Sequence, residues 1–430
     1  MTGRYQTRLT SATDASVAEH RPVWETLEEI AREGARRLLA DVLEWEVEDF
    51  LGRRRHERGG EFRGYRNGHA PEREVGTGLG AVRVRAPRVA DVPAEVATEG
   101  YRSEMLPRYQ RRTAESNALL TRLYLEGLSS GDFEPVFREF MGEAAPLSAS
   151  TILRLKEGWA EEFQAWSRRK LDGQRYAYVW FDGLHLGCGH EDEHSVVLCV
   201  IGVGEDGAKE LLALRLGYRE STESWKELLR DLRDRGLKAP LVGCGDGALG
   251  AWAALAEIYP STRHQRCWNH RVLNLQDKLP KRLQAAARQE VRRLWEAPTR
   301  KECEERRDSY VAQLREQGQV QAADCLLRDW DDFVTFYDFP KEHWVHLRTT
   351  NPIESVFGGV RVRTRVARRM QVRENALYLV FKVIQRLAYN WRALNGGATL
   401  MTLVLSRTRF VDGVMVVAPP TPPEPLAQAA

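Results

Sequence analysis

The 430-residue sequence lacks the marks of several protein classes. Nowhere does it approach the roughly 18 to 20 uninterrupted apolar residues of a membrane helix, and its first 17 residues have no apolar centre of a signal peptide. The six cysteines form no Cys-x-x-Cys pair, which favours reduced thiols over a disulfide framework. The net charge is only +3, and there is no internal repeat. We therefore expect a soluble cytoplasmic protein of two or three domains, with no membrane partner.

Apolar residues at three- and four-residue steps predict amphipathic helix over residues 23–52. The next block is dense in arginine and glycine, and between positions 63 and 88 six arginines oppose two glutamates. There Val82 and Val84 alternate with arginines, as in a half-exposed strand. A solvated basic loop and a DNA contact surface are the two interpretations. The residues predicted to contact DNA are Arg63, Arg66, Asn67, Arg83 and Arg85.

Residues 111–171 have the periodicity of three short helices. Ser148 and Ser150 are candidate caps of the last helix, and Arg154 and Lys156 follow in its early turns. The arrangement is similar to the second helix of a helix-turn-helix, although three helices also pack together without any role in DNA recognition. We predict a helical DNA-binding region with Arg154 and Lys156 among its contacts.

Beyond Arg175 the pattern becomes that of an α/β fold. Three β-rich runs precede a capped helix, a buried strand, another helix and another strand, an order typical of a mixed sheet of the ribonuclease H type. Residues 269–345 are charge-rich and helical in pattern, which indicates an all-helical insertion. A helix capped near Asn351 and a final helix then complete the domain, and a proline-rich tail is predicted to be disordered.

Three acidic residues are the candidate catalytic groups. Asp182 is expected to end the most apolar strand and Asp246 a second buried strand, each followed by glycine, although Asp-Gly is also an ordinary turn. Glu354 is expected on the first turn of a helix, where its side chain can face both strand ends. With the two aspartates it would form a triad of carboxylates. Oxygen ligands suit two Mg²⁺ or Mn²⁺ ions about 3.5–4 Å apart, which serve phosphodiester displacement.

The sequence resembles the Mutator-type transposases of bacterial insertion sequences in three signature blocks, YVWFDG, DGALGAWAALAEIYPSTRHQRCWNH and LRTTNPIESVFGGVRVRTRV. With RGYRNGHAPEREVGTGLGAVRVRAPRV, LEGLSSGDFEPVF and LSASTILRLKEGWAEEF, the resemblance spans roughly residues 60 to 395. It implies a DDE transposase whose triad is Asp182, Asp246 and Glu354. Such an enzyme binds terminal inverted repeats, cleaves the element ends and joins the 3′-OH to target DNA, in the bacterial cytoplasm on the nucleoid.

Two element ends must be brought together, so the resemblance also implies at least a dimer, with residues 23–52 as a candidate pairing surface. The predicted parts are a helical and basic region for DNA binding and dimerisation (1–110), a helix-turn-helix-like region (111–172), a ribonuclease H-like catalytic domain (173–270 with 346–400), an all-helical insertion (271–345) and a partly disordered tail (401–430).

Cys267 and His270 match the Cys-x-x-His signature of the family. They form half of a zinc site, but no second ligand pair lies at matching spacing, so we favour packing beside the active site. An aromatic group matches the end of the family's helical insertion, where core packing is more common than stacking on DNA bases. These aromatic residues are Trp330, Phe333 and Phe336.

Arginines downstream of Glu354 would offer counter-charge to DNA phosphates, whereas a solvated helix face is the alternative. They are Arg361, Arg363, Arg365, Arg368 and Arg369.

Two other functions stay open. A catalytically inactive, transposase-derived DNA-binding regulator would have no need of the three acids that this sequence retains. A zinc-dependent hydrolase would use Cys267 with His270, or a cluster that follows the first strand. Strand alternation sends neighbouring side chains to opposite faces, which favours a polar turn over a zinc site in that cluster. Its members are His185, Cys188, His190 and His194.

Overall fold

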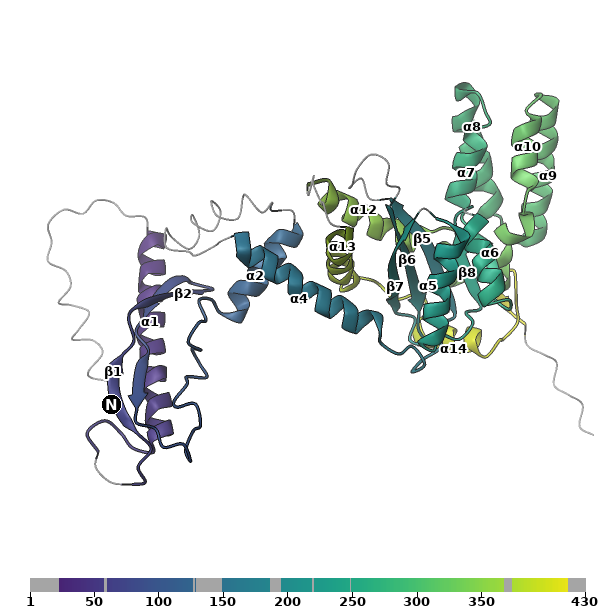
Figure 1. Cartoon of the computed structure of the whole chain (residues 1–430). Helices are drawn as coiled ribbons and strands as arrows, with labels where there is room; N and C mark the ends of the chain where they lie inside the picture. The colour runs from purple at the N-terminus through teal and green to yellow at the C-terminus, as the bar shows by residue number, and fades with distance from the viewer. Residues whose placement is uncertain are drawn as a thin grey trace, which may run out of the picture. The chain divides into compact units, whose positions relative to one another are not determined.

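The computed structural model describes residues 23–57, 60–126, 128, 149–185, 195–218, 220–247, 249–366 and 373–416 (Figure 1). The chain divides into two compact units, residues 1–152 and 153–430. Among the helices in these ranges, none is both long and apolar enough to cross a membrane.

The first unit is built on the long helix α1 (Val23–Leu51). One face of α1 packs on short antiparallel strands, where Leu43, Val75, Val82 and Val84 are buried together. Val82 and Val84 point inward and Arg83 outward, which confirms the predicted alternation. The strands pair as β1 (Tyr65–His69) with β4 (Pro87–Ala90) and β2 (Arg73–Thr77) with β3 (Gly80–Val84), and α2 (Ala114–Glu126) follows.

The second unit contains a five-stranded mixed sheet in the order β7-β6-β5-β8-β9. The central strand β5 pairs antiparallel with β6 and parallel with β8. β7 lies antiparallel to β6, and β9 lies parallel to β8. The predicted α/β fold with a mixed sheet is confirmed. The strands are β5 (Tyr178–His185), β6 (Ser195–Val203), β7 (Lys209–Tyr218), β8 (Val242–Gly245) and β9 (Arg263–Arg266).

Helices α5 (Thr222–Asp234) and α6 (Leu249–Ile258) cover one face of this sheet (Figure 1). The Ser221 side chain caps α5 by accepting a hydrogen bond from the Ser224 amide. At the centre of the core the Phe181 ring lies 4.9 Å from the ring of Trp252. A Cβ at Gly245 would lie 2.5 Å from the Phe181 ring, so glycine at the end of β8 makes room for that ring.

Tyr178 and Trp180 of β5 point to the other face, since they alternate with the residues of that core. The Tyr178 hydroxyl lies 2.9 Å from His343 Nδ1, and Trp180 Nε1 donates to the His346 carbonyl. Helices α12 (Asn351–Val366) and α13 (Arg373–Ala388) contact β5 and β7, respectively. These contacts fix the start of α12 relative to the central strand.

Between β9 and α12, where every residue is described, the chain forms helices and turns without a strand. The side chains of Trp330, Phe333 and Phe336 are buried here, so they contribute to a core. The elements are α7 (Trp268–Gln276), α8 (Lys281–Trp295), α9 (Arg300–Glu316), α10 (Val320–Leu327), η1 (Trp330–Phe333), η2 (Thr335–Asp338), η3 (Lys341–His343) and α11 (Trp344–Leu347).

Within the predicted tail (401–430), the described residues 401–416 form the end of a helix and a pair of strands. Met401, Val404 and Phe410 are buried. They belong to α14 (Gly397–Leu405) and to the antiparallel pair β10 (Phe410–Val411) and β11 (Val414–Met415). The proline-rich residues 417–430 lie outside the described residues.

Candidate active site

Two aspartates lie on neighbouring parallel strands. The register of β5 with β8 pairs Trp180 with Cys244, so Asp182 and Asp246, each two residues farther along, come level with each other. Asp246 directly follows β8, as predicted. The expectation that Asp182 ends its strand was wrong, because β5 continues beyond it and Gly183 pairs with β6 instead of forming a turn.

Negative charge is crowded at this edge of the sheet. Burial is the largest cause that raises the pKa of Asp182, to about 7, and the charges of Asp246 and Glu220 act in the same direction. The Gly183 amide donates to Asp182 Oδ1 at 2.8 Å and, like the nearby His270, partly offsets this effect. A carboxyl group in such surroundings binds a proton near neutral pH unless another positive charge takes its place.

The third acid, Glu354, lies in the first turn of α12 and is held from the preceding residues. The Thr350 hydroxyl lies 2.5 Å from Glu354 Oε1. The same threonine places its amide and its hydroxyl each 3.2 Å from Cys267 Sγ. The Cys267 amide in turn donates to the carbonyl of Gly245, the last residue of β8. Cys267 therefore joins the strand that carries Asp246 to the helix that carries Glu354.

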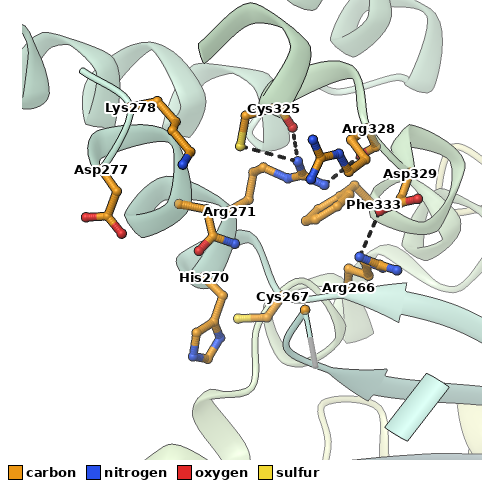
Figure 2. A pocket seen from close by; sticks show the side chains of 12 residues that line it. Arg266, Cys267, His270, Arg271, Asp277, Lys278, Cys325, Arg328, Asp329 and Phe333 are labelled. Carbon is orange, nitrogen blue, oxygen red and sulfur yellow. Dashed lines mark hydrogen bonds and ion pairs between the residues drawn. The ribbon is translucent and has the colours of Figure 1, made fainter. Parts of the chain in front are cut away.

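His270 lies near all three acids. Its Nδ1 is 3.7 Å from Glu354 Oε1, and Figure 2 shows its ring beside Cys267 at the start of α7. The Cys267 thiol, and then the charges of Asp246 and Glu354, raise the pKa of His270 to about 9 against the opposing effect of burial. The structure thus brings the predicted triad and the Cys-x-x-His pair into one neighbourhood.

A fourth carboxylate, Glu220, belongs to this neighbourhood and was missed in the sequence. A Cβ on Gly183 would lie 2.3 Å from Glu220 Oε1, so the carboxylate rests directly on the backbone next to Asp182. Glu220 pairs with His185 at 3.2 Å. Burial and the charge of Asp246 raise the pKa of Glu220. The glycine after Asp182 was the available signal, because a glycine inside a strand often marks a close approach.

Comparison with known proteins decides the class to which this site belongs. The chain matches the family described as "Transposase, Mutator family" over residues 7–394. The chain belongs to the Mutator family of transposases. Proteins of this kind are enzymes that act on DNA, and the resemblance in the signature blocks is confirmed over nearly the whole chain.

Individual relatives of this transposase are similar over most of their length. The transposase for insertion sequence element IS6120 of Mycolicibacterium smegmatis is 40% identical over 317 residues, 73% of this chain and 98% of the relative. The transposase for IST2 of Acidithiobacillus ferrooxidans is 40% identical over 63% of this chain and 92% of its own length. The transposase for ISRM5 of Rhizobium meliloti is 30% identical over 85% and 89%, respectively.

Two sets of residues in the transposase have the chemistry to hold a metal ion. One is the carboxylate group just described, whose oxygens suit hard divalent cations. The other is Cys267, His270 and Glu354, whose ligand atoms lie within 4.8 Å of one another. The donors of Thr350 already contact the Cys267 thiol and the Glu354 carboxylate, and Cys267 is only 2% exposed. Cys267 is therefore packed among its neighbours, the interpretation favoured from the sequence, and a zinc site there stays a prediction.

The N-terminal arginines predicted to contact DNA each have an acidic neighbour. Arg66 is the most enclosed of them, since it pairs with two glutamates of α1. Asn67 is exposed on β1. Part of the positive charge of this block is therefore balanced within the protein, and its contact with DNA stays a prediction. The pairs are Arg63–Glu61, Arg66–Glu44, Arg83–Glu74 and Arg85–Glu72.

The arginines of α12 lie on different sides of that helix. Arg361 is exposed, whereas Arg363 is only 3% exposed, on the same face as the buried Phe357 and Val360. As it stands, Arg363 does not present its guanidinium to solvent. Arg368 and Arg369 lie outside the described residues, as do the side chains of Arg365, Arg154 and Lys156, although the last two belong to α4 (Ala149–Ser167).

The predicted histidine and cysteine cluster is described only at its first member. His185 ends β5 and pairs with Glu220. Cys188, His190 and His194 lie outside the described residues, so the choice between a polar turn and a zinc site stays a prediction.

Proposed function

We propose that this transposase binds the terminal inverted repeats of its own element, cleaves the element ends, and joins the exposed 3′-OH to target DNA. The reaction centre consists of Asp182, Asp246 and Glu354 in a ribonuclease H-like catalytic domain. One observation carries the proposal: two aspartates lie level on adjacent parallel strands, and the charges of both reach the same histidine that lies 3.7 Å from Glu354.

The donor set fits divalent cations. Carboxylates from three separate elements supply hard oxygen ligands, and the crowding of negative charge around Asp182 calls for a positive counter-charge. Two Mg²⁺ or Mn²⁺ ions bound by Asp182, Asp246 and Glu354 would activate the attacking oxygen and stabilise the leaving oxygen of the phosphodiester.

In this scheme the protein's own residues mainly hold the reacting groups in place. Asp182 and Asp246 offer oxygens from the rigid edge of the sheet, and Thr350 orients the Glu354 carboxylate. No side chain is needed as nucleophile, because water attacks in the cleavage step and the 3′-OH attacks in the joining step. Cys267 and His270 are positioning residues in this scheme.

The test is cleavage of end-labelled DNA that carries the repeats flanking the reading frame, with Mg²⁺, Mn²⁺ or chelator. The wild-type protein is expected to nick the repeat boundary only when metal is present, and Asp246→Asn is expected to abolish nicking. Asp234→Asn is the matched control, since this aspartate is exposed at the end of α5. Near wild-type cleavage by Asp246→Asn would overturn the proposal. Specific binding without cleavage by the wild type would favour the inactive regulator.

The proposal includes a dimer built on α1. Its outward face carries large apolar side chains that the first unit leaves exposed: Leu27, Ile30, Leu38 and Trp45. About a two-fold axis at position 36, an antiparallel second copy places Leu27 opposite Trp45 and Leu38 opposite Gly34. No atom lies within 4 Å of the Cβ position of Gly34, so there is room for the incoming leucine. The stripe is therefore self-complementary, and we propose a second copy of this chain as its occupant.

A further inference from the structure

A pocket of about 270 Å³ lies immediately beside the acids, between β9, α7 and the segment after α10 (Figure 2). Gly247, which follows Asp246, forms part of its wall, and so do Cys267 and His270. The pocket and the candidate active site therefore share a boundary. Its other lining residues are Arg266, Arg271, Asn274, Asp277, Lys278, Cys325, Arg328, Asp329 and Phe333.

The lining is rich in permanent positive charge. Four lysine and arginine side chains face two carboxylates, and only Asp329 is paired with one of those cations, Arg266, at 2.9 Å. Figure 2 shows Asp277 and Asp329 at opposite margins. Within the described chain, the side chains of Lys278 and Arg328 have no hydrogen-bond or ion-pair partner in the protein. These two cations are free to bind an anion.

Behind them, Arg271 provides a fixed charge. It is only 5% exposed, and its guanidinium donates to the carbonyls of Cys325 and Arg328 while lying 4.0 Å from the Phe333 ring centroid. Its Nε is buried and, in the described structure, has no hydrogen-bond partner. The Asn274 amide, 3.9 Å from the Cβ position of Gly247, adds a donor on the side of the acids.

We propose that this pocket binds a backbone phosphate of the DNA strand, next to the phosphodiester that is cleaved. The inference rests on the proposed function, because it places the strand against Asp246. A phosphate offers several acceptor oxygens to donors that approach from different sides, which matches an amine, a guanidinium and an amide around one hollow. Fixing the adjacent phosphate would hold the reacting one in register with the acids.

The experiment compares Lys278→Gln/Arg328→Gln with Lys281→Gln/Arg282→Gln, which removes the same charge from exposed positions at the start of α8. The probe is a duplex of the terminal repeat in which single phosphates near the cleavage position are replaced by neutral methylphosphonates. Binding is measured in Ca²⁺ at several salt concentrations, and thermal unfolding confirms that both variants are folded.

For the wild type and the control we expect one methylphosphonate position to weaken binding by about tenfold, as expected for loss of a charged contact. The pocket variant should bind the unmodified duplex about tenfold more weakly than the wild type, and the methylphosphonate at this position should weaken its binding no further. The slope of its log affinity against log salt concentration should be smaller by about 1 to 2. An unchanged interference pattern in the pocket variant would overturn the inference. Because binding is the readout, this result is separate from a failure of cleavage, which would count against the proposed function.

Discussion

The substitution Leu38→Gln tests the proposed dimer most directly. The Leu38 side chain is 63% exposed on the outward face of α1, and glutamine is nearly as good a helix former as leucine. Complete burial of a leucine contributes about 1.5–3 kcal/mol, so covering the exposed part contributes about 1–2 kcal/mol. Both copies lose it, so the dissociation constant is expected to rise about 30- to 1,000-fold.

The assay is sedimentation or light scattering over a range of protein concentrations, on the free protein and on its complex with end DNA. Leu79→Gln is the matched control, because Leu79 is 56% exposed and belongs to the turn between β2 and β3 instead of to α1. Both substitutions lie on the surface and should change the free energy of unfolding by no more than about 0.5 kcal/mol. Equal dissociation constants for the two variants, or one chain on two DNA ends, would refute the reasoning.

Three further predictions follow from the second unit. Glu220→Gln should lower Mn²⁺ affinity, measured by electron paramagnetic resonance, and slow DNA cleavage, whereas Glu223→Gln on the exposed start of α5 should do neither. Gly183→Ala should displace the Glu220 carboxylate and slow DNA cleavage as Glu220→Gln does, with little change in melting temperature. A normal cleavage rate would contradict this. Burial, with the nearby charge of Lys209, lowers the pKa of His346 to about 4, so unfolding takes up a proton between about pH 6.5 and 4 and stability falls as pH drops through that range. His346→Phe should flatten this part of the stability profile measured by denaturant titration.

Local patterns were enough to predict the framework of the second unit. The order of strands and helices and the capped start of α5 each depend on a few neighbouring residues, as does the inward alternation of Val82 and Val84 in the first unit. Asp246 was placed correctly because a strand and its end lie within one short segment. In each of these cases the interactions concerned are short-range.

The sequence predictions differ from the structure where a contact with a distant residue determines the local conformation. Gly183 looked like part of a turn, but it is inside β5, where it gives room to Glu220 from beyond the next two strands. Arg363 was predicted to contact DNA only because its segment is rich in arginine. Its helical spacing from Phe357 and Val360, however, puts it on the buried face of α12. Periodicity was available for Arg363, whereas the only signal for Glu220 was Gly183 itself, which marks a close approach without naming the residue that approaches.

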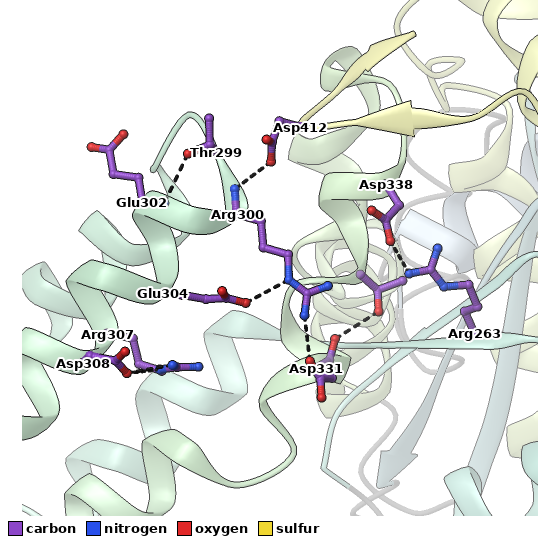
Figure 3. Close-up of polar contacts among 11 residues, drawn as sticks. Arg263, Thr299, Arg300, Glu302, Glu304, Arg307, Asp308, Asp331, Asp338 and Asp412 are labelled. Atoms are coloured by element: carbon purple, nitrogen blue, oxygen red, sulfur yellow. Dashed lines mark hydrogen bonds and ion pairs between the residues drawn. The ribbon is translucent and has the colours of Figure 1, made fainter. Parts of the chain in front are cut away.

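Contacts that fasten the helical segment could not be read from the sequence either. Figure 3 shows Arg300 at the start of α9, where its amide donates to Asp412 and its guanidinium to Glu304 and Asp331. Asp412 lies 112 residues away from Arg300 along the chain, in the turn between β10 and β11. Such pairings depend on which surfaces meet after folding, and single charged residues carry no record of their partners.

Hydrogen bonds join the two ends of the helical segment (residues 268–348), and they explain how Asp246 and Glu354 keep a fixed relation although they are far apart in sequence. The Trp268 amide, where the segment begins, donates to the Arg348 carbonyl, where it ends, at 2.9 Å. One residue earlier, Cys267 is bonded both to the end of β8 and to Thr350. The entry and exit of the segment are thus fixed to each other at the sheet. Because the entropy of closing a loop grows only slowly with its length, the helices between can change in size while the start of α12 stays fixed to the end of β8.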